Sequence, residues 1–143
     1  MPGTQPSRRP NIFPCLRYED APAAIEWLVR AFGFERGLVV PNPDGTIAHA
    51  ELKLEPGAIM LGSAREDHFG MKSPRKLGGI NQSIYIALGD VDAHYRLAKE
   101  AGAEIVMEPH DTDYGSREYG ARDPEGNLWS FGTYLPDHET TES

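Results

Sequence analysis

Residues 18–35 read YEDAPAAIEWLVRAFGFE, and this stretch decides the fold. Asp20 can cap a helix by accepting backbone N–H groups. The apolar residues at positions 25, 28, 29 and 32 follow the i, i+3, i+4, i+7 spacing of an amphipathic helix. Gly33 suits a left-handed C-cap. The stretch therefore predicts a helix that begins at Asp20 and ends at Gly33.

Residues 88–104 read LGDVDAHYRLAKEAGAE and repeat this pattern. Asp20 and Asp90 are 70 residues apart, and Gly33 and Gly102 are 69 residues apart, so the two copies agree in register to within one residue. An extended segment precedes each helix and three strand candidates follow it. The predicted strands are 12–18, 36–41, 46–54 and 57–63 in the first half and 82–88, 104–109, 115–122 and 127–134 in the second. The prediction is an α+β fold of two tandem βαβββ modules.

The composition fits one globular domain with short tails. The chain has 143 residues, and we predict tails at 1–10 and 136–143 around a domain at 11–135. Within the domain, module one covers about 11–63, a linker loop 64–80 and module two about 81–135. Loops of this length are usually lids or linkers.

Charge and cysteine content exclude several classes of protein. The formal net charge is −8 and the pI is near 5.0, which argues against nucleic acid and anionic membrane surfaces as partners. The single Cys15 excludes an internal disulfide framework. No apolar run approaches the roughly 20 residues of a membrane span. We therefore expect a soluble cytoplasmic protein.

Alternation along the strands predicts an apolar side under the helices and an inner side that faces a pocket. Trp129 and Phe131 are assigned to the helix side. The residues assigned to the inner side or to a neighbouring wall of the pocket are Cys15, Arg17, His49, Glu51, Met60, Ser83, Tyr85, Arg117, Tyr119 and Ser130.

Arg117 and Tyr119 have the same parity in the strand 115–122. An inward arginine offers a planar donor fork that suits a carboxylate or phosphate on a ligand. An intramolecular salt bridge, for example from Arg117 to Glu51, is an equally weighted alternative. With aromatic rings beside the arginine, the pocket would take a ligand with a flat apolar body and a polar end.

His49 and Glu51 project from one face of their strand. Such a pair can form half of a metal site, but two protein ligands are too few, so a polar pocket wall is the preferred interpretation. Cys15 can be a nucleophile only beside a base that the sequence does not identify. A small buried apolar residue is the preferred interpretation of Cys15.

The tandem modules, the stretch from YEDA to AFGF and the closing DPEGNLW turn resemble the glyoxalase/bleomycin-resistance/dioxygenase superfamily, also called vicinal oxygen chelate. The similarity covers about residues 11–135 and is greatest to the glyoxalase-like and bleomycin-resistance-like branch. It implies an incurved eight-stranded mixed sheet around a cavity, with the helices outside, and frequent homodimers.

The resemblance also implies a divalent metal held by the first and fourth strands of each module. The matching positions here are Phe13 (or Pro14), Met60, Ser83 and Ser130, and none provides an imidazole or a carboxylate. We therefore expect no metal and no other cofactor. The predicted function is metal-independent binding of a small molecule by a homodimer. The alternatives are a glyoxalase-type lyase or isomerase with an unusual metal or acid–base site, and a domain that serves only as an interaction module.

Overall fold

The computed structural model describes residues 9–136, so the predicted tails lie almost entirely outside the described residues. The chain divides into two compact units, with the boundary between Gly79 and Ile80. Each unit contains one βαβββ module, as predicted. The strands form two separate four-stranded mixed sheets, one in each module.

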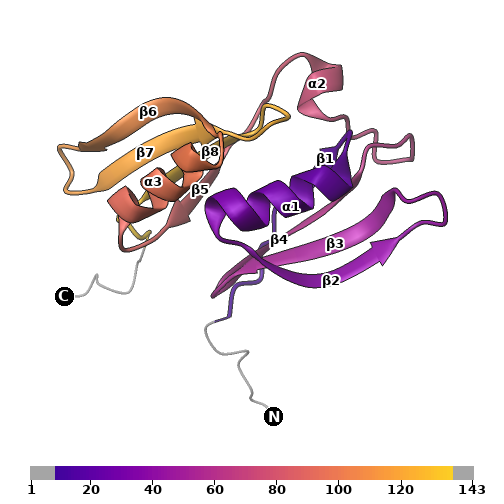
Figure 1. Cartoon of the computed structure of the whole chain (residues 1–143), viewed down its shortest axis with the longest axis horizontal. Helices are drawn as coiled ribbons and strands as arrows, with labels where there is room; N and C mark the ends of the chain where they lie inside the picture. Colours follow the sequence, from indigo (N-terminus) through magenta and orange to yellow (C-terminus); the bar gives the residue numbers. More distant parts are fainter. Residues whose placement is uncertain (1–8, 137–143) are drawn as a thin grey trace, which may run out of the picture. The chain divides into compact units, whose positions relative to one another are not determined.

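Module one has its strands in the order β1-β4-β3-β2, with α1 along one face of the sheet (Figure 1). Its elements are β1 (Cys15–Tyr18), α1 (Ala21–Phe32), β2 (Glu35–Pro41), β3 (Ile47–Leu54) and β4 (Gly57–Ser63). β1 pairs with β4 in parallel, and the other pairs are antiparallel. β1 begins three residues later than predicted, after Pro14, which has no N–H to donate to the sheet.

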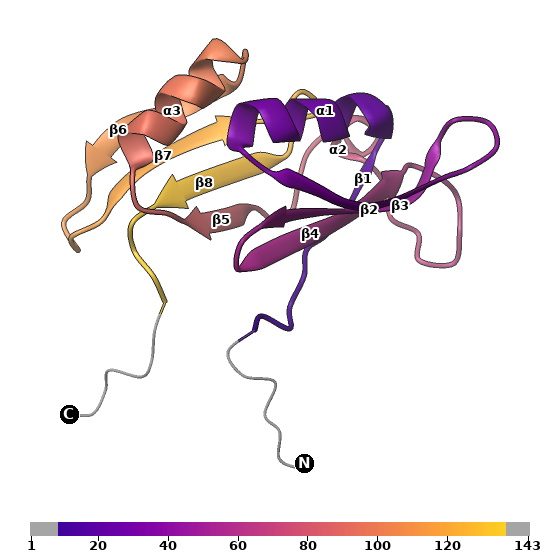
Figure 2. The ribbon, with the colours of Figure 1, turned by 60° about the horizontal axis from the view of Figure 1, so that its bottom comes forward.

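Module two repeats this arrangement with the order β5-β8-β7-β6, and α3 covers one face of its sheet (Figure 2). Its elements are β5 (Ile84–Ala87), α3 (Val91–Glu100), β6 (Glu104–Asp111), β7 (Arg117–Arg122) and β8 (Leu128–Gly132). The parallel pair is β5 with β8. The predicted element types are therefore confirmed in both modules.

The predicted helix ends follow from their capping residues. The Asp20 side chain accepts a hydrogen bond from the Ala23 backbone N–H at 3.1 Å, and Asp90 accepts one from Ala93 at 3.0 Å. Gly33 and Gly102 have φ values of +83° and +93°, in the left-handed region that glycine adopts without strain. The two starts and the two ends are thus determined locally.

The DPEGNLW stretch is a turn organised by one carboxylate. Asp123 Oδ1 accepts from the Glu125 and Asn127 backbone N–H groups, and Oδ2 accepts from the Asn127 side-chain amide and from Trp129 Nε1 at 3.1 Å. Trp129 is fully buried. Asp123 therefore connects the turn to the core of module two.

The segment between the modules contains an element that the sequence reasoning missed, the short helix α2 (Pro74–Leu77). Ser73 caps it by accepting from the Lys76 backbone N–H, and the Ser73 hydroxyl donates to the Glu19 carboxylate next to α1. Ser73 is completely buried. This contact anchors the segment to module one.

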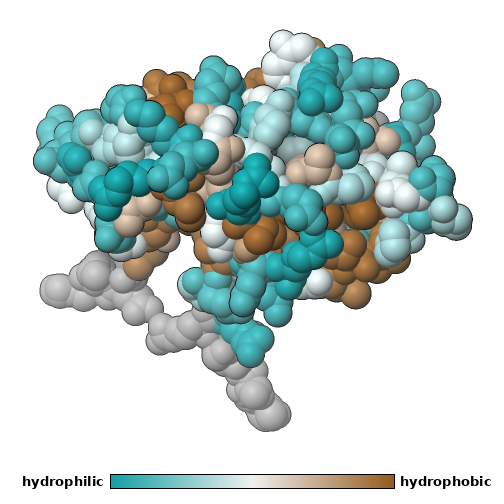
Figure 3. Space-filling view, in the orientation of Figure 1, coloured by the Kyte–Doolittle hydropathy of each residue, from teal (hydrophilic) through white to brown (hydrophobic). Residues whose placement is uncertain are grey.

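The exposed hydrophobic side chains are spread over several elements. Leu38 and Val40 lie on β2, whereas Val106 and Met107 lie on β6. The face in Figure 3 is mostly hydrophilic, with separate hydrophobic patches. Among residues 9–136, no helix is long and apolar enough to cross a membrane.

Candidate functional site

In module one, the sheet face opposite α1 carries the five positions of this module that the sequence assigned to a pocket. The strand register pairs Cys15 with Met60, Met60 with Glu51, and Arg17 with Gly62. Directly paired residues share a face, and residues two apart along a strand do so as well. His49 therefore lies on the same face as Glu51.

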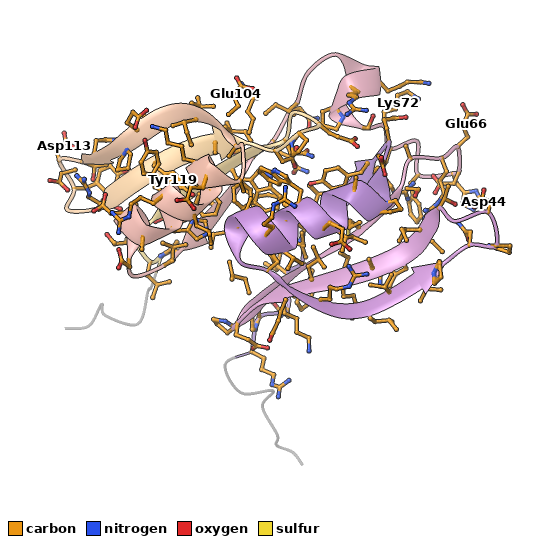
Figure 4. The ribbon with its side chains drawn as sticks, viewed as in Figure 1. Asp44, Glu66, Lys72, Glu104, Asp113 and Tyr119 are labelled. Atoms are coloured by element: carbon orange, nitrogen blue, oxygen red, sulfur yellow. The ribbon has the colours of Figure 1, made fainter. Side chains whose placement is uncertain are left out.

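A cavity of about 330 Å³ opens on this face. Four of the predicted pocket residues line it, namely Cys15, Arg17, His49 and Met60. The segment after β4 contributes Arg65, Phe69 and Met71, which the sequence reasoning missed. Glu66 and Lys72 of the same segment are exposed and point outward (Figure 4).

Arg17 is the buried charge of this cavity, with only 8% of the residue exposed. Its Nη2 donates to Asp67 Oδ2 at 3.1 Å, and Arg65 Nε donates to the same oxygen at 3.3 Å. Arg17 Nη1 is buried and has no hydrogen-bond partner among the described residues. Burial alone would raise the pKa of Asp67, but the hydrogen bonds from Arg17 and the Phe69 backbone N–H outweigh it, so the pKa is lowered.

His49 and Glu51 form a hydrogen-bonded pair, with 2.9 Å between His49 Nε2 and Glu51 Oε2. Both side chains are about 40% exposed (41% and 39%). His49 lines the cavity, and Glu51 is its hydrogen-bond partner. The pair thus presents one imidazole to the cavity and one carboxylate that orients it.

The preferred interpretation of Cys15 as a buried residue is wrong. Cys15 is exposed, and its thiol lies 3.7 Å from the Phe13 carbonyl oxygen. The reason is its position at the first residue of β1, where the strand enters the sheet and the side chain faces the cavity rather than α1.

In module two, Tyr85 and Ser130 are paired across β5 and β8 and line a cavity of about 560 Å³. The Tyr85 hydroxyl donates to the Tyr134 carbonyl oxygen at 2.6 Å. Burial raises the pKa of Tyr85. Ser83 precedes β5, is exposed and does not line this cavity.

The assignment of Arg117 and Tyr119 to the pocket face is wrong, because β7 presents both residues to α3. Tyr119 is paired with Phe131, stacks on its ring and is 1% exposed. The Tyr119 hydroxyl lies 2.6 Å from His94 Nδ1 on α3, and Figure 4 shows Tyr119 beside this helix. Burial raises the pKa of Tyr119.

Arg117 donates to Asp92 of α3 at 3.1 Å and to Asp111 of β6 at 3.3 Å. The intramolecular salt bridge, which was the alternative interpretation of Arg117, is therefore correct in kind, with these two carboxylates as partners. The hydrogen bond to Asp92 is the main reason that the pKa of Arg117 is raised. Burial opposes this effect, and the bond to Asp111 adds to it.

The opposite face of β7 contributes Glu118, which the sequence reasoning missed together with Tyr114 and Tyr134. The Tyr114 hydroxyl lies 3.1 Å from both carboxylate oxygens of Glu118. Side chains alternate along a strand, so placing Tyr119 on the helix side would have placed Glu118 on the cavity side.

The metal that the family resemblance implies does not fit these residues. Phe13, Met60, Ser83 and Ser130 offer no imidazole or carboxylate, and a divalent ion needs several such donors. Within residues 9–136, no three His, Cys, Asp or Glu side chains are grouped to hold an ion. We therefore derive no chemistry through a metal at these positions.

Comparison with known proteins identifies the family. Residues 12–131 match the family model described as the Glyoxalase/Bleomycin resistance protein/Dioxygenase superfamily. The match covers nearly all of the described chain and both modules. The chain belongs to this superfamily.

Its relatives include an uncharacterised protein of Mycobacterium bovis, 37% identical over 125 residues that cover 86% of this chain and 82% of the relative. The crystal structure of TioX from Micromonospora sp. ML1 is similar with 35% identity and a TM-score of 0.70, over 87% of this chain and all (100%) of that chain. A family enzyme from Burkholderia phytofirmans, 20% identical with a TM-score of 0.60 over 87% of this chain and 96% of that chain, shares the fold.

Proposed function

We propose that this protein binds a small organic molecule in the module-one cavity without a metal ion. The observation that carries the proposal is Arg17 Nη1, a buried charged donor with no partner among the described residues. Buried polar groups are nearly always hydrogen-bonded, so a donor of this kind calls for a partner other than the described residues. An anionic or strongly accepting group of a ligand would supply it.

The rest of the cavity supports a ligand with an apolar body. Met60, Phe69 and Met71 contribute apolar surface beside the arginine. Small-molecule sites typically combine such a lining with a few placed polar groups. Asp67 holds the other arm of the Arg17 guanidinium, so the free Nη1 has a defined direction. The ligand class in this proposal is therefore a compact apolar molecule that carries a carboxylate or a similar acceptor.

Binding of benzoate compared with benzyl alcohol tests this proposal, because the two probes share a ring and differ in charge. We expect the wild-type protein to prefer benzoate, with chemical-shift changes at the amides of Arg17 and Met60. Arg17→Gln should weaken benzoate binding by roughly 1.5–3 kcal/mol, the usual range for a hydrogen bond to a charged group. Arg36→Gln is the matched control, since Arg36 pairs with Glu26 at an exposed position of module one.

A trapped water molecule is the competing explanation for Nη1, because buried waters commonly serve otherwise unpartnered groups. In that case benzoate and benzyl alcohol would bind equally, and Arg17→Gln would change neither affinity. Native mass spectrometry of the protein as purified adds an independent test. A retained organic molecule that is lost from the Arg17→Gln variant would support the proposal.

A second candidate function is acid–base catalysis by the His49–Glu51 pair, in the manner of a lyase or isomerase. The supporting observation is the 2.9 Å hydrogen bond that orients an imidazole at the cavity wall. An oriented imidazole is suited to removing a proton next to a carbonyl group. Phenylacetone in D₂O tests this: catalysed deuterium exchange that disappears in His49→Gln would favour an enzyme, and no exchange above buffer would leave binding alone.

The proposal includes a homodimer and a small-molecule ligand as the partners of the chain. Closed twofold pairs are the commonest soluble oligomers. The exposed apolar residues on β2 and β6 provide surface that a second copy can cover.

A further inference from the structure

The module-two cavity differs from the module-one cavity in its chemistry. It lies on the sheet face opposite α3, and its volume is about 560 Å³. The lining residues are Tyr85, Tyr114, Glu118, Ser130, Tyr134 and Pro136. The rings of Tyr114 and Tyr134 are perpendicular, with their centroids 6.0 Å apart. Aromatic rings and one carboxylate therefore surround this space.

Glu118 has an acidic group but no cationic neighbour bonded to it within residues 9–136. The preceding Arg117 points to the α3 side, where Asp92 and Asp111 bind it. His110 is paired with Glu118 across β6 and β7, but its Nδ1–H donates to the Glu108 carbonyl oxygen at 2.9 Å. Among residues 9–136, the Glu118 carboxylate accepts hydrogen bonds from the Tyr114 hydroxyl, which shares one proton between the two oxygens. Glu118 thus retains acceptor capacity toward the cavity.

Gly132 leaves room for the side chains of Tyr85 and Glu118 beside it. A Cβ atom at this position would lie 2.6 Å from the Tyr85 hydroxyl oxygen and 2.7 Å from Glu118 Cγ. Both distances are far below van der Waals contact. A side chain at position 132 would displace Tyr85 or Glu118, so the glycine in β8 is needed for both residues to keep these positions.

The charge of the second half of the chain favours a cation there. Residues 80–143 contain 4 Lys and Arg against 13 Asp and Glu, a net charge of −9. Residues 1–79 contain 10 against 9, a net charge of +1. A surface of one sign raises the local concentration of ligands of the opposite sign.

We propose that the module-two cavity is a second binding site, selective for an organic cation such as a protonated or quaternary amine with an aromatic substituent. Glu118 provides the counter-charge, and the faces of Tyr85, Tyr114 and Tyr134 provide cation–π contacts. This site is independent of the function proposed for module one, because it uses no residue of that cavity.

Titration of the isotopically labelled full chain with benzylammonium and with benzyl alcohol tests the proposal by NMR. We expect benzylammonium to bind about fivefold more tightly or better, with saturable shifts at the amides of Tyr85, Glu118 and Ser130. High salt should reduce this preference. Glu118→Gln should abolish it, because the amide keeps the shape of the side chain and removes its charge.

Two further variants separate a built site from a general acidic surface. Glu104→Gln also removes one negative charge. Glu104 is the first residue of β6, whereas Glu118 of β7 is paired with His110 near the last residue of β6. Figure 4 shows Glu104 away from Asp113 and the β6–β7 turn, so this variant should leave the affinity unchanged. Tyr114→Phe keeps the ring and frees both carboxylate oxygens, so the affinity should be no lower than in the wild type. Equal binding of the two probes would overturn the proposal, and so would equal losses in Glu104→Gln and Glu118→Gln. Arg17→Gln should affect only benzoate, so the two proposals fail independently.

Discussion

Tyr119→Phe tests the corrected position of Tyr119, because the substitution removes one hydroxyl and leaves the ring. The hydroxyl lies 2.6 Å from His94 Nδ1, and Tyr119 is 1% exposed. The ring keeps its stacking on Phe131, with centroids 4.9 Å apart. A buried hydrogen bond contributes roughly 0.5–1.5 kcal/mol, and a buried polar atom that loses its partner adds to the cost, so we expect a loss of about 1–2 kcal/mol in the free energy of unfolding.

Urea unfolding followed by tryptophan fluorescence measures this loss. The chain has two tryptophans, and in a Trp27→Phe background the signal comes only from the buried Trp129 of module two. Tyr85→Phe is the matched control. Its hydroxyl bonds at an exposed position, so a change within about 0.5 kcal/mol is expected. Binding of benzylammonium should be unaffected by Tyr119→Phe.

The free energy of unfolding at alkaline pH provides a second test of Tyr119→Phe. Burial raises the pKa of Tyr119, so above about pH 10 the phenol ionises in the unfolded chain before it ionises in the folded one. Its contribution to stability is therefore complete below that pH and is lost as pH rises. Tyr119→Phe should make the alkaline fall in stability shallower. Unchanged stability together with lost ligand binding would refute the assignment of Tyr119 to the core.

Four other predictions concern the metal content, the oligomeric state, Arg117 and Trp129. Elemental analysis of protein purified without added metal should find no stoichiometric divalent ion, and a chelator should leave the melting temperature unchanged; one tightly held equivalent of zinc, iron, nickel or manganese would contradict this. Light scattering at micromolar concentration should give the mass of a homodimer, and the mass of one chain would count against it. Arg117→Ala should lower stability slightly, because its ion pairs are partly exposed, and should leave benzoate binding intact; a loss of binding would return Arg117 to the ligand site. Trp129→Ala should cost about 3–5 kcal/mol of unfolding free energy in a denaturation experiment, and a stable variant would show that the core lies elsewhere.

The helices and their ends were predictable because the determining signals are local. Asp20 and Asp90 cap within three residues of themselves, and Gly33 and Gly102 take φ values that other residues rarely adopt. The repeat then supplied the strand count. The division into two four-stranded sheets, in place of the expected single eight-stranded sheet, could not be predicted. Hydrogen bonding between strands far apart in sequence leaves no local pattern.

The face of β7 could not be read from alternation alone, because Tyr119 and Glu118 are both large. Strand register decides the face, and a shift of one residue exchanges the two sides. Tyr119 is paired with Phe131, which the sequence had assigned to the helix side. In the same way, Ala50 is paired with Leu61 in module one. Aligning the repeats at their spacing of 69 residues would have placed Tyr119 with the buried Ala50.

The residues that the segment after β4 adds to the module-one cavity could not be predicted from the sequence for a different reason. Arg65, Phe69 and Met71 belong to no regular strand or helix, so periodicity assigns them no face. Asp67 holds Arg65 and the Phe69 backbone N–H by hydrogen bonds, and it also binds Arg17 of β1. A contact across 50 residues of sequence is outside the range of any local signal.

The two modules show how one backbone arrangement can form cavities lined by different charged groups. Gly62 and Gly132 occupy equivalent positions, since Gly62 is paired with Arg17 on β1 and Gly132 with Ala87 on β5. Each glycine leaves room for a large side chain: Arg65 Nη1 lies 3.1 Å from where a Cβ of Gly62 would be, and the Tyr85 hydroxyl lies 2.6 Å from that of Gly132. Module one places a guanidinium beside its glycine, whereas module two places a tyrosine and Glu118 there. The selectivity proposed for each half, for an anion in module one and for a cation in module two, therefore rests on side chains, whereas the two modules share the backbone arrangement.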